Sequence, residues 1–234
     1  MKNNYHETEK GGIFFYILFA IALLAALTFA INRDNRSSTS TVTTQQAKLA
    51  AQEILEQSEI VKTAFQKLIL RGYQPTDISF ENNIVAGYTL STCTIDDCKI
   101  FATSGGALNW LSAAAIAANG NNWIYSGVSA IEDNGASAQY DIVMILPNVN
   151  DEVCRNLNLN LGITSALSDP IPVTDDTTIS IQQLNDTYPI AASANVFDGT
   201  DITGNDAVCV QVGTMSGAHT GTNQLFFVQT VYAG

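Results

Sequence analysis

The segment QQAKLAAQEILEQSEIVKTAFQKLILR occupies residues 45–71 and has the composition of a helix. It contains neither Gly nor Pro and is rich in Ala, Gln, Glu, Leu and Lys, which favour helical backbone. Apolar residues recur at heptad-like spacing with one gap at Ser58, and polar residues occupy the opposite face. The apolar positions are Ala51, Ile54, Val61, Phe65 and Leu68, and the polar positions are Gln52, Glu53, Glu56, Glu59 and Lys62. With Gly72 as a C-terminal stop, the pattern predicts an amphipathic helix of about seven turns.

The apolar stripe of this helix has two candidate partners. It can pack on the domain that follows at residues 72–234, or it can pair with another helix in a coiled coil or an assembly. The stripe is too short to decide between the two, so both interpretations stay open at this point.

A second apolar segment, IFFYILFAIALLAALTFAI, lies upstream at residues 13–31 and carries no charge. As a helix it would be about 28 Å long, close to the hydrocarbon thickness of a bilayer. A signal peptide has a shorter apolar stretch, and a buried core helix is seldom apolar over such a length. We therefore expect a transmembrane helix at 13–31, between a leader-like polar N-terminus at 1–12 and a polar linker at 32–44.

The charge of the chain is concentrated in its C-terminal part. The formal net charge is −12. Residues 72–234 contain only Lys99 and Arg155 as basic residues, so the excess of carboxylates lies in this part. Because proteins that bind nucleic acid normally present a basic face, we expect no nucleic-acid partner. The acidic part and the cysteines in it favour a head domain outside the cytoplasm.

From Gly72 onward, short apolar runs alternate with turn residues, which predicts an α+β head with an antiparallel sheet. Helices are expected at 108–118 and at 151–161, the latter between the N-cap Asn150 and Gly162. Residues 164–206 are rich in Thr, Asp and Asn, which predicts long loops around short strands. The expected strands are 84–90, 123–131, 140–146, 207–212 and 225–232.

Four cysteines, Cys93, Cys98, Cys154 and Cys209, all lie in the expected head. An even number in an exported domain predicts two disulfides, for which three connectivities exist. The polar turn between Cys93 and Cys98 suits a local bridge, which would leave Cys154 and Cys209 to close a loop of about 55 residues. A zinc site matches the spacing poorly, and free thiols would be expected only in a reducing compartment.

No catalytic constellation is recognisable in the sequence. There is no HExxH, P-loop or GxGxxG motif, and GTMSG at 213–217 is not a nucleophile elbow. His6 and His219 are the only histidines, and Asp198, Asp201 and Asp206 do not have EF-hand spacing. We therefore expect no enzyme activity, no cofactor and no metal.

The layout resembles the type IV pilin superfamily, including the pseudopilins of type II secretion. A polar leader ends in Lys10-Gly11-Gly12, Ile13-Phe14-Phe15 opens the apolar helix, and an amphipathic helix and an α+β head with late cysteines follow. The resemblance implies that a leader peptidase cuts after Gly12, which makes Ile13 the first mature residue. It also implies that a bridge between Cys154 and Cys209 would bound the C-terminal region of a pilin-like head.

The chain departs from the family pattern at the fifth mature position. That position is usually Glu and here is Ile17, which favours a minor or specialised subunit over a bulk major pilin. The polar stretch at 32–44 would also interrupt the continuous stalk helix of the family.

We therefore expect a structural subunit that assembles through its apolar N-terminal helix into a type IV pilus-like filament or a secretion pseudopilus, and that displays an acidic head. Its expected partners are the inner membrane, like subunits or other pilin-like proteins, the leader peptidase and the assembly machinery. Its expected location is the inner membrane, as a single-pass protein with a periplasmic head, or the cell exterior when assembled. The alternative, favoured by Ile17 and the polar linker, is a signal-anchored periplasmic or cell-surface binding domain that does not polymerise.

Overall fold

The structure is a computed structural model that describes residues 11–113, 115–119, 121–132, 141–175, 178–185, 196–217 and 220–233. The chain divides into two compact units, Met1–Gln45 and Gln46–Gly234. The amphipathic segment at 45–71 therefore belongs almost entirely to the same unit as the head.

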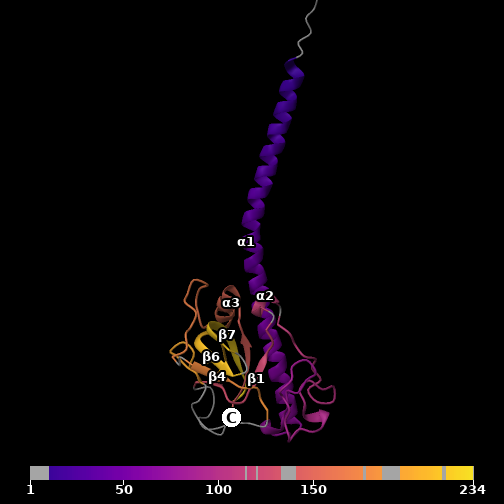
Figure 1. Ribbon diagram of the computed structural model, residues 1–234, viewed down its shortest axis with the longest axis vertical. Helices are drawn as coiled ribbons and strands as arrows, with labels where there is room; N and C mark the ends of the chain where they lie inside the picture. The colour runs from indigo at the N-terminus through magenta and orange to yellow at the C-terminus, as the bar shows by residue number, and fades with distance from the viewer. Residues whose placement is uncertain are drawn as a thin grey trace, which may run out of the picture. The chain divides into compact units, whose positions relative to one another are not determined.

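The first element is the helix α1, Gly11–Leu70 (Figure 1). It includes residues 32–44, for which we expected a linker, because residues 13–71 contain neither Gly nor Pro to end the helix. Among the described residues, none of the helices combines the length and the apolar character that crossing a membrane requires. The expected transmembrane helix at 13–31 is therefore wrong, and so is the single-pass inner-membrane location that depended on it. The apolar run is instead the first part of a longer helix that continues into polar sequence.

The head contains a five-stranded sheet in the order β1-β3-β7-β6-β4. Its pairs are antiparallel except for β4 and β6, which are parallel, and a separate parallel pair joins β2 and β5. The expected antiparallel sheet is thus confirmed. The strands are β1 Ile124–Ser126, β2 Ala130–Ile131, β3 Ile142–Pro147, β4 Thr178–Ile181, β5 Val196–Phe197, β6 Ala207–Gly217 and β7 Gly221–Tyr232.

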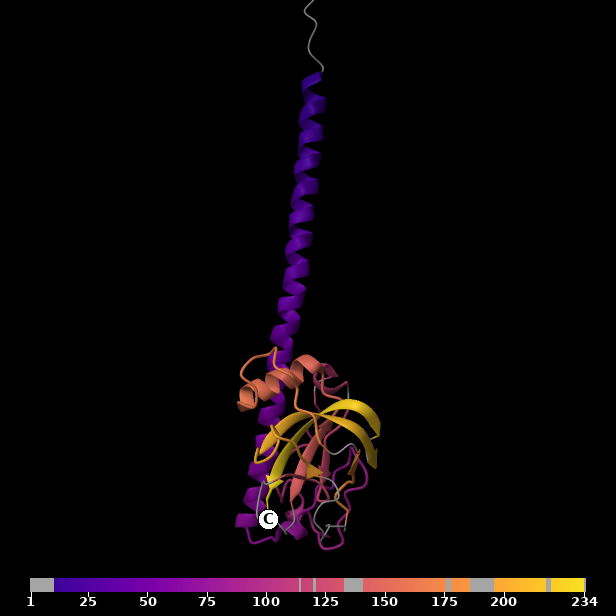
Figure 2. The same cartoon turned by 90° about the vertical axis from the view of Figure 1, so that its left-hand side faces the viewer.

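Three short helices and one longer helix complete the described part of the head. The helix α3 packs against β6 and β7 (Figure 2). Its predicted ends are confirmed: the Asn150 side chain accepts a hydrogen bond from the Glu152 amide at 3.1 Å, and Gly162 ends the helix with a φ of 76°. The helices are η1 Pro75–Asp77, η2 Asp96–Cys98, α2 Ala115–Ala118 and α3 Asp151–Leu161.

Strand residues alternate between two apolar clusters, because successive side chains of a strand point to opposite faces. On β3, Met144 lies in the cluster that includes the buried face of α1, and its neighbour Ile145 lies in the cluster on the other face. On β6, Cys209 and Val210 divide in the same way. The sheet is therefore covered on both faces, and the C-terminal part of α1 belongs to one of its two cores.

Two expected elements are absent or shorter. Residues 84–90 form no strand, because Asn82 Oδ1 accepts hydrogen bonds from the amides of Ile84 at 2.9 Å and Val85 at 2.7 Å and so closes a turn. The helix expected at 108–118 is limited to α2, Ala115–Ala118. Short strands do occur within 164–206, as expected there, in the form of β4 and β5.

Candidate functional site

The apolar stripe of α1 is buried against the head, and this decides between the two interpretations left open by the sequence. Ala51, Val61, Phe65 and Leu68 have no exposed surface, and Ile54 is 1% exposed. Within the head unit these side chains share one core with strand residues such as Met144 and Phe227. The predicted stripe is thus an intramolecular core face and is not available to another helix.

Polar contacts fix the rotation of this part of α1. The buried indole of Trp123 donates to Gln57 Oε1 at 3.0 Å, and Gln229 Nε2 on β7 donates to Glu59 Oε1 at 2.7 Å. The Nζ atom of Lys62 lies 3.4 Å from Asp206 Oδ2 in a partly exposed ion pair. Each contact joins α1 to a different part of the head, so a rotation of the helix about its axis would break all of them.

The C-terminal end of α1 holds a nearby turn in place. The Arg71 guanidinium donates to the carbonyl oxygens of Ser104 at 3.0 Å and Gly105 at 2.8 Å. Gly105 and Gly106 lie so close to the backbone of Lys99 and Ile100 that a Cβ atom at either position would collide with a carbonyl oxygen. The turn can therefore form only with glycine at both positions, and the chain continues from it to Leu108.

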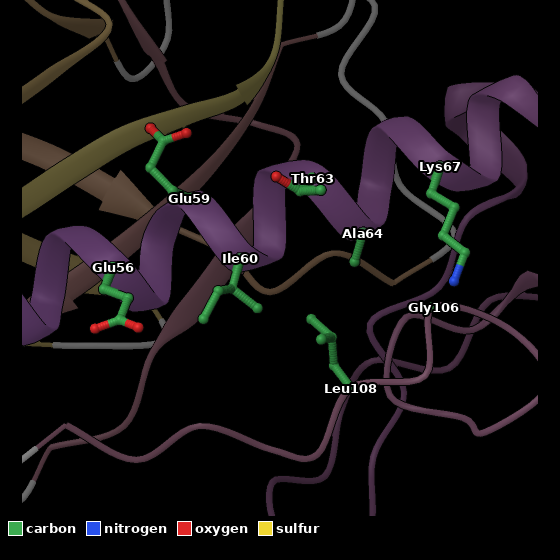
Figure 3. A pocket seen from close by; sticks show the side chains of 8 residues that line it. All are labelled: Glu56, Glu59, Ile60, Thr63, Ala64, Lys67, Gly106 and Leu108. Atoms are coloured by element: carbon green, nitrogen blue, oxygen red, sulfur yellow. The ribbon is translucent and has the colours of Figure 1, made fainter.

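A groove of about 360 Å³ runs between α1 and this turn (Figure 3). Ile60 and Leu108 approach each other at its centre, with Glu56 toward one end and Lys67 toward the other. The groove is therefore apolar in the middle and oppositely charged at its two ends. Its lining residues are Glu56, Glu59, Ile60, Thr63, Ala64, Lys67, Gly106 and Leu108.

The aromatic core beside the groove offers no ionisable group near neutral pH. Tyr88 is 1% exposed and its hydroxyl accepts from the amide of Tyr125 at 3.2 Å. Burial raises the pKa of Tyr88 to about 12 and raises the pKa of Tyr125 well above its usual 10. Both phenols therefore stay neutral and act as packing groups: Tyr125 stacks on Phe80, and both rings contact Trp110 in tilted or edge-to-face geometry.

The structure contains two disulfides, Cys93–Cys98 and Cys154–Cys209, so the expectation of disulfide bonds is confirmed. They join the two pairs that the spacing favoured and indicate an oxidising environment. The first bridge lies in a small apolar cluster with Leu90. The second attaches α3 to β6.

Asn158, which no sequence motif indicates, reinforces the second bridge. Its Nδ2 atom donates to the carbonyl oxygen of Cys209 at 2.7 Å, and its Oδ1 atom accepts from the amide of Cys209 at 2.8 Å. On the side of β6 that faces away from β7, the Gln211 amide donates to the Pro172 carbonyl and the Gln211 carbonyl accepts from the Thr174 amide. Farther along, from Thr214 onward, β4 pairs with this side of β6. The fully buried Asn158 amide therefore takes the place of a neighbouring strand at Cys209.

Both basic residues of 72–234 are engaged in ion pairs. Lys99 lies 3.1 Å from Asp96 and 3.3 Å from Glu81, and Arg155 lies 2.8 Å from Asp151. The hydrogen bond to Asp96 is the main reason why the pKa of Lys99 is raised. Lys99 and Arg155 are the only basic residues of this region, so most carboxylates of residues 72–234 have no basic side chain from the same region beside them.

The N-terminal unit presents large apolar side chains to solvent. Ile17, Phe19 and Ile21 are 51%, 56% and 58% exposed. They lie on consecutive odd positions of α1, and the sequence around them is uncharged from 13 to 31. This is the segment that we expected to be buried in lipid.

The remaining predicted site residues are not brought together into a reactive centre. Gly12 and Ile13 lie in the first turn of α1, and cleavage between them stays a prediction. Residues 1–10 of the expected leader, including His6, and His219 lie outside the described residues. The part of the chain that the structure describes contains no cluster of His, Cys, Asp or Glu suited to a metal, and this includes Asp198, Asp201 and Asp206.

Comparison with known proteins gives no relative: no family model matches the chain, and no curated protein or solved structure matches it either.

Proposed function

We propose that this chain is a structural subunit, similar to a minor or specialised pilin or pseudopilin, that assembles through the apolar N-terminal part of α1 and displays an acidic head. The observation that carries the proposal is the exposure of Ile17, Phe19 and Ile21 on an uncharged stretch of helix. Ile17 and Ile21, four residues apart, lie on the same face of the helix, and exposed apolar side chains of this size are typical of interaction sites.

The energetic argument follows from the size of these side chains. Complete burial of one Ile or Phe side chain contributes about 1.5–3 kcal/mol. Packing this segment against the same segment of other copies would bury several such side chains per subunit. The apolar stripe of α1 at 51–68 is not available as a partner for this segment, because it is already buried in the core of the head.

The acidic head supports the second half of the proposal. Lys99 and Arg155 are the only basic residues of 72–234 and both are engaged in ion pairs, so carboxylates dominate the charge of this region. Two disulfides join segments of the head and suit a domain that is displayed in an oxidising environment.

Assembly can be tested with two matched substitutions. Ile21 and Ile84 are 58% and 60% exposed, the first in the N-terminal unit and the second in the head. We expect Ile21→Glu to abolish filaments that are recovered by shearing from the producing cells, because the charge would be buried in the assembly. Ile84→Glu should leave the yield of filaments unchanged.

N-terminal sequencing of the mature chain provides the second arm. A mature chain that starts at Ile13 would support the pilin-like assignment, and a chain that retains Met1 would contradict it. Filaments that persist with Ile21→Glu would contradict assembly through this segment. If the wild-type chain forms no filaments, the alternative of a binding domain that does not polymerise becomes the better description.

A further inference from the structure

A second stripe runs along α1 on the side away from the core, and we call it the outer stripe. It consists of Leu49, Glu56, Ile60, Thr63, Lys67 and Leu70, which follow one another at steps of seven, four or three residues. All six side chains are exposed. Leu49, Ile60 and Leu70 are large apolar residues that are 65%, 38% and 89% exposed, so the outer stripe has the spacing of a helix-pairing surface.

The charges of the outer stripe favour one orientation of a partner helix. Glu56 and Lys67 mark the two ends of the groove, with Ile60 and Leu108 between them (Figure 3). They are eleven residues, or about three turns, apart on α1. Within the described residues neither makes an ion pair, in contrast to Lys62, which is paired with Asp206.

The surface has an acidic end, an apolar centre and a basic end. It is therefore complementary to a second copy of itself that runs in the opposite direction. In an antiparallel pair of α1 helices, Glu56 of each copy would lie opposite Lys67 of the other. Ile60 would then lie in the same layer as Thr63 of the second copy, and Leu108 would widen the apolar centre. A parallel pair would instead place Glu56 beside Glu56 and Lys67 beside Lys67, which is repulsive.

We propose that two copies of this chain pair antiparallel through the outer stripe of α1, related by a twofold axis between residues 61 and 62. Such an interface is isologous and closes on two copies. It uses residues 53–70 of α1, whereas the proposed filament contact uses residues 13–31. Each contact can therefore be abolished while the other is retained, and the pairing goes beyond the proposed function.

The pairing is weak and reversible, because α1 ends at Leu70 and the two helices overlap only over residues 53–70, or about five turns. Charged residues also form a large part of the surface. Interfaces of this kind lie at the lower end of the size range for specific contacts. We expect a dissociation constant on the order of 10 µM at low salt. The two Glu56–Lys67 pairs are exposed, so they contribute to orientation more than to affinity.

Sedimentation equilibrium of the full chain tests the pairing, with Ile21→Glu present throughout to remove the proposed filament contact. Glu56→Lys and Lys67→Glu should each weaken the dimer about tenfold, because each replaces two attractive pairs with two repulsive ones. An equimolar mixture of the two variants should recover dimers of wild-type affinity, because every pair in the mixed dimer is attractive again. Lys48→Glu is the matched control: it makes the same charge change on an exposed position of α1 outside the outer stripe and should have little effect.

The single variants and the mixture together separate the antiparallel from the parallel arrangement. A parallel pair has two repulsive contacts in the wild type and in each single variant, so the single variants would associate like the wild type and the mixture would associate more tightly than the wild type. Recovery in the mixture together with a loss of association at high salt would support the proposal. A chain that stays monomeric at about 100 µM, single variants that associate like the parent, or a mixture that stays monomeric would each overturn it. Loss of filaments with Ile21→Glu would bear only on the proposed function, because that substitution lies outside the outer stripe.

Discussion

Replacing Asn158 tests whether its amide stabilises the head by acting as a neighbouring strand for β6. The two hydrogen bonds to Cys209 are 2.7 and 2.8 Å long, and Asn158 and Cys209 have no exposed surface. In Asn158→Ala, the amide and the carbonyl of Cys209 would both remain buried without these partners. Each such group costs about 1–3 kcal/mol, so we expect the free energy of unfolding to fall by about 3 kcal/mol.

Urea denaturation with the disulfides intact measures this loss. For a head of this size the dependence of the unfolding free energy on urea is roughly 2–3 kcal/mol per M, so the midpoint should fall by about 1 M with little change in slope. Asn156→Ala is the matched control on the same helix. The Asn156 amide donates at 2.7 Å to the Glu152 carbonyl within α3, and we expect its removal to cost less than about 1 kcal/mol because no strand loses a partner.

Asn158→Asp adds a pH dependence that a simple loss of packing would not produce. A protonated carboxyl can donate to the Cys209 carbonyl and accept from its amide, whereas a carboxylate can only accept. Burial raises the pKa of such a carboxyl, so the deficit in stability should be smaller at about pH 4 than at about pH 8. The reasoning would be refuted if Asn158→Ala were no more costly than Asn156→Ala, or if the Asp variant showed the same deficit at both pH values.

Three further predictions follow from the head. Replacing both Cys154 and Cys209 with Ser removes their bridge and should lower the unfolding free energy by about 4 kcal/mol in the loop-entropy model. Urea denaturation under non-reducing conditions measures this loss, and an unchanged urea midpoint would contradict it. Burial raises the pKa of Tyr88 to about 12, so its contribution to stability is fully present below pH 10 and is lost as the pH rises toward 12. Ultraviolet titration should show a tyrosine that ionises well above pH 10, and a single midpoint near pH 10 for every tyrosine would contradict this. The pKa of Asp169 is lowered because backbone amides of the preceding turn donate to its carboxylate, so its contribution to stability is present above the usual 3.8 and is lost as the pH falls through the lowered value. Asp169→Asn should therefore be less stable than wild type at about pH 7, and thermal unfolding should show that this difference shrinks as the pH falls below 3.8; a difference that does not change with pH would contradict it.

The parts of the fold that were predictable are those with a local signal. The buried face of α1 follows directly from the spacing of Ile54, Val61, Phe65 and Leu68, because a helix places such residues on one side. The ends of α3 follow from an Asn cap and a terminal Gly, whose effects act within one turn. Neither conclusion required knowledge of what the helix packs against.

The secondary-structure predictions were wrong where the preference of a short segment competed with its neighbours in the sequence or with its packing in the fold. Ser, Thr and Asn at 32–44 favour helix weakly, yet nothing in the segment ends a helix that strong formers flank on both sides. At 84–90 the apolar spacing suggested a strand, but the side chain of Asn82 closes a turn that the alternation of apolar residues does not reveal. The Ala-rich segment at 108–118 contains Trp110, which packs among the aromatic rings of the core in place of extending a helix.

The groove and the Asn158 contact could not be predicted, because each joins residues that are far apart in the sequence. Asn158 contacts a residue 51 positions away, and an Asn within a polar helix gives no sign of such a partner. Leu108 meets Ile60 only because Arg71 and two glycines hold the intervening turn against α1. The spacing of the outer stripe was present in the sequence, but its exposure became evident only once the opposite face was known to be buried.

Cys154 and Asn158 lie four residues apart on α3, and both contact Cys209. The two hydrogen bonds of the Asn158 amide hold α3 against β6 at the position that brings the two sulfur atoms together. Their effective concentration in the reduced, folded chain is then far higher than that of either thiol with Cys93 or Cys98. The fold thus favours one of the three ways in which four cysteines can pair, and the bond forms when a two-electron oxidant accepts the electrons and the two thiol protons go to solvent.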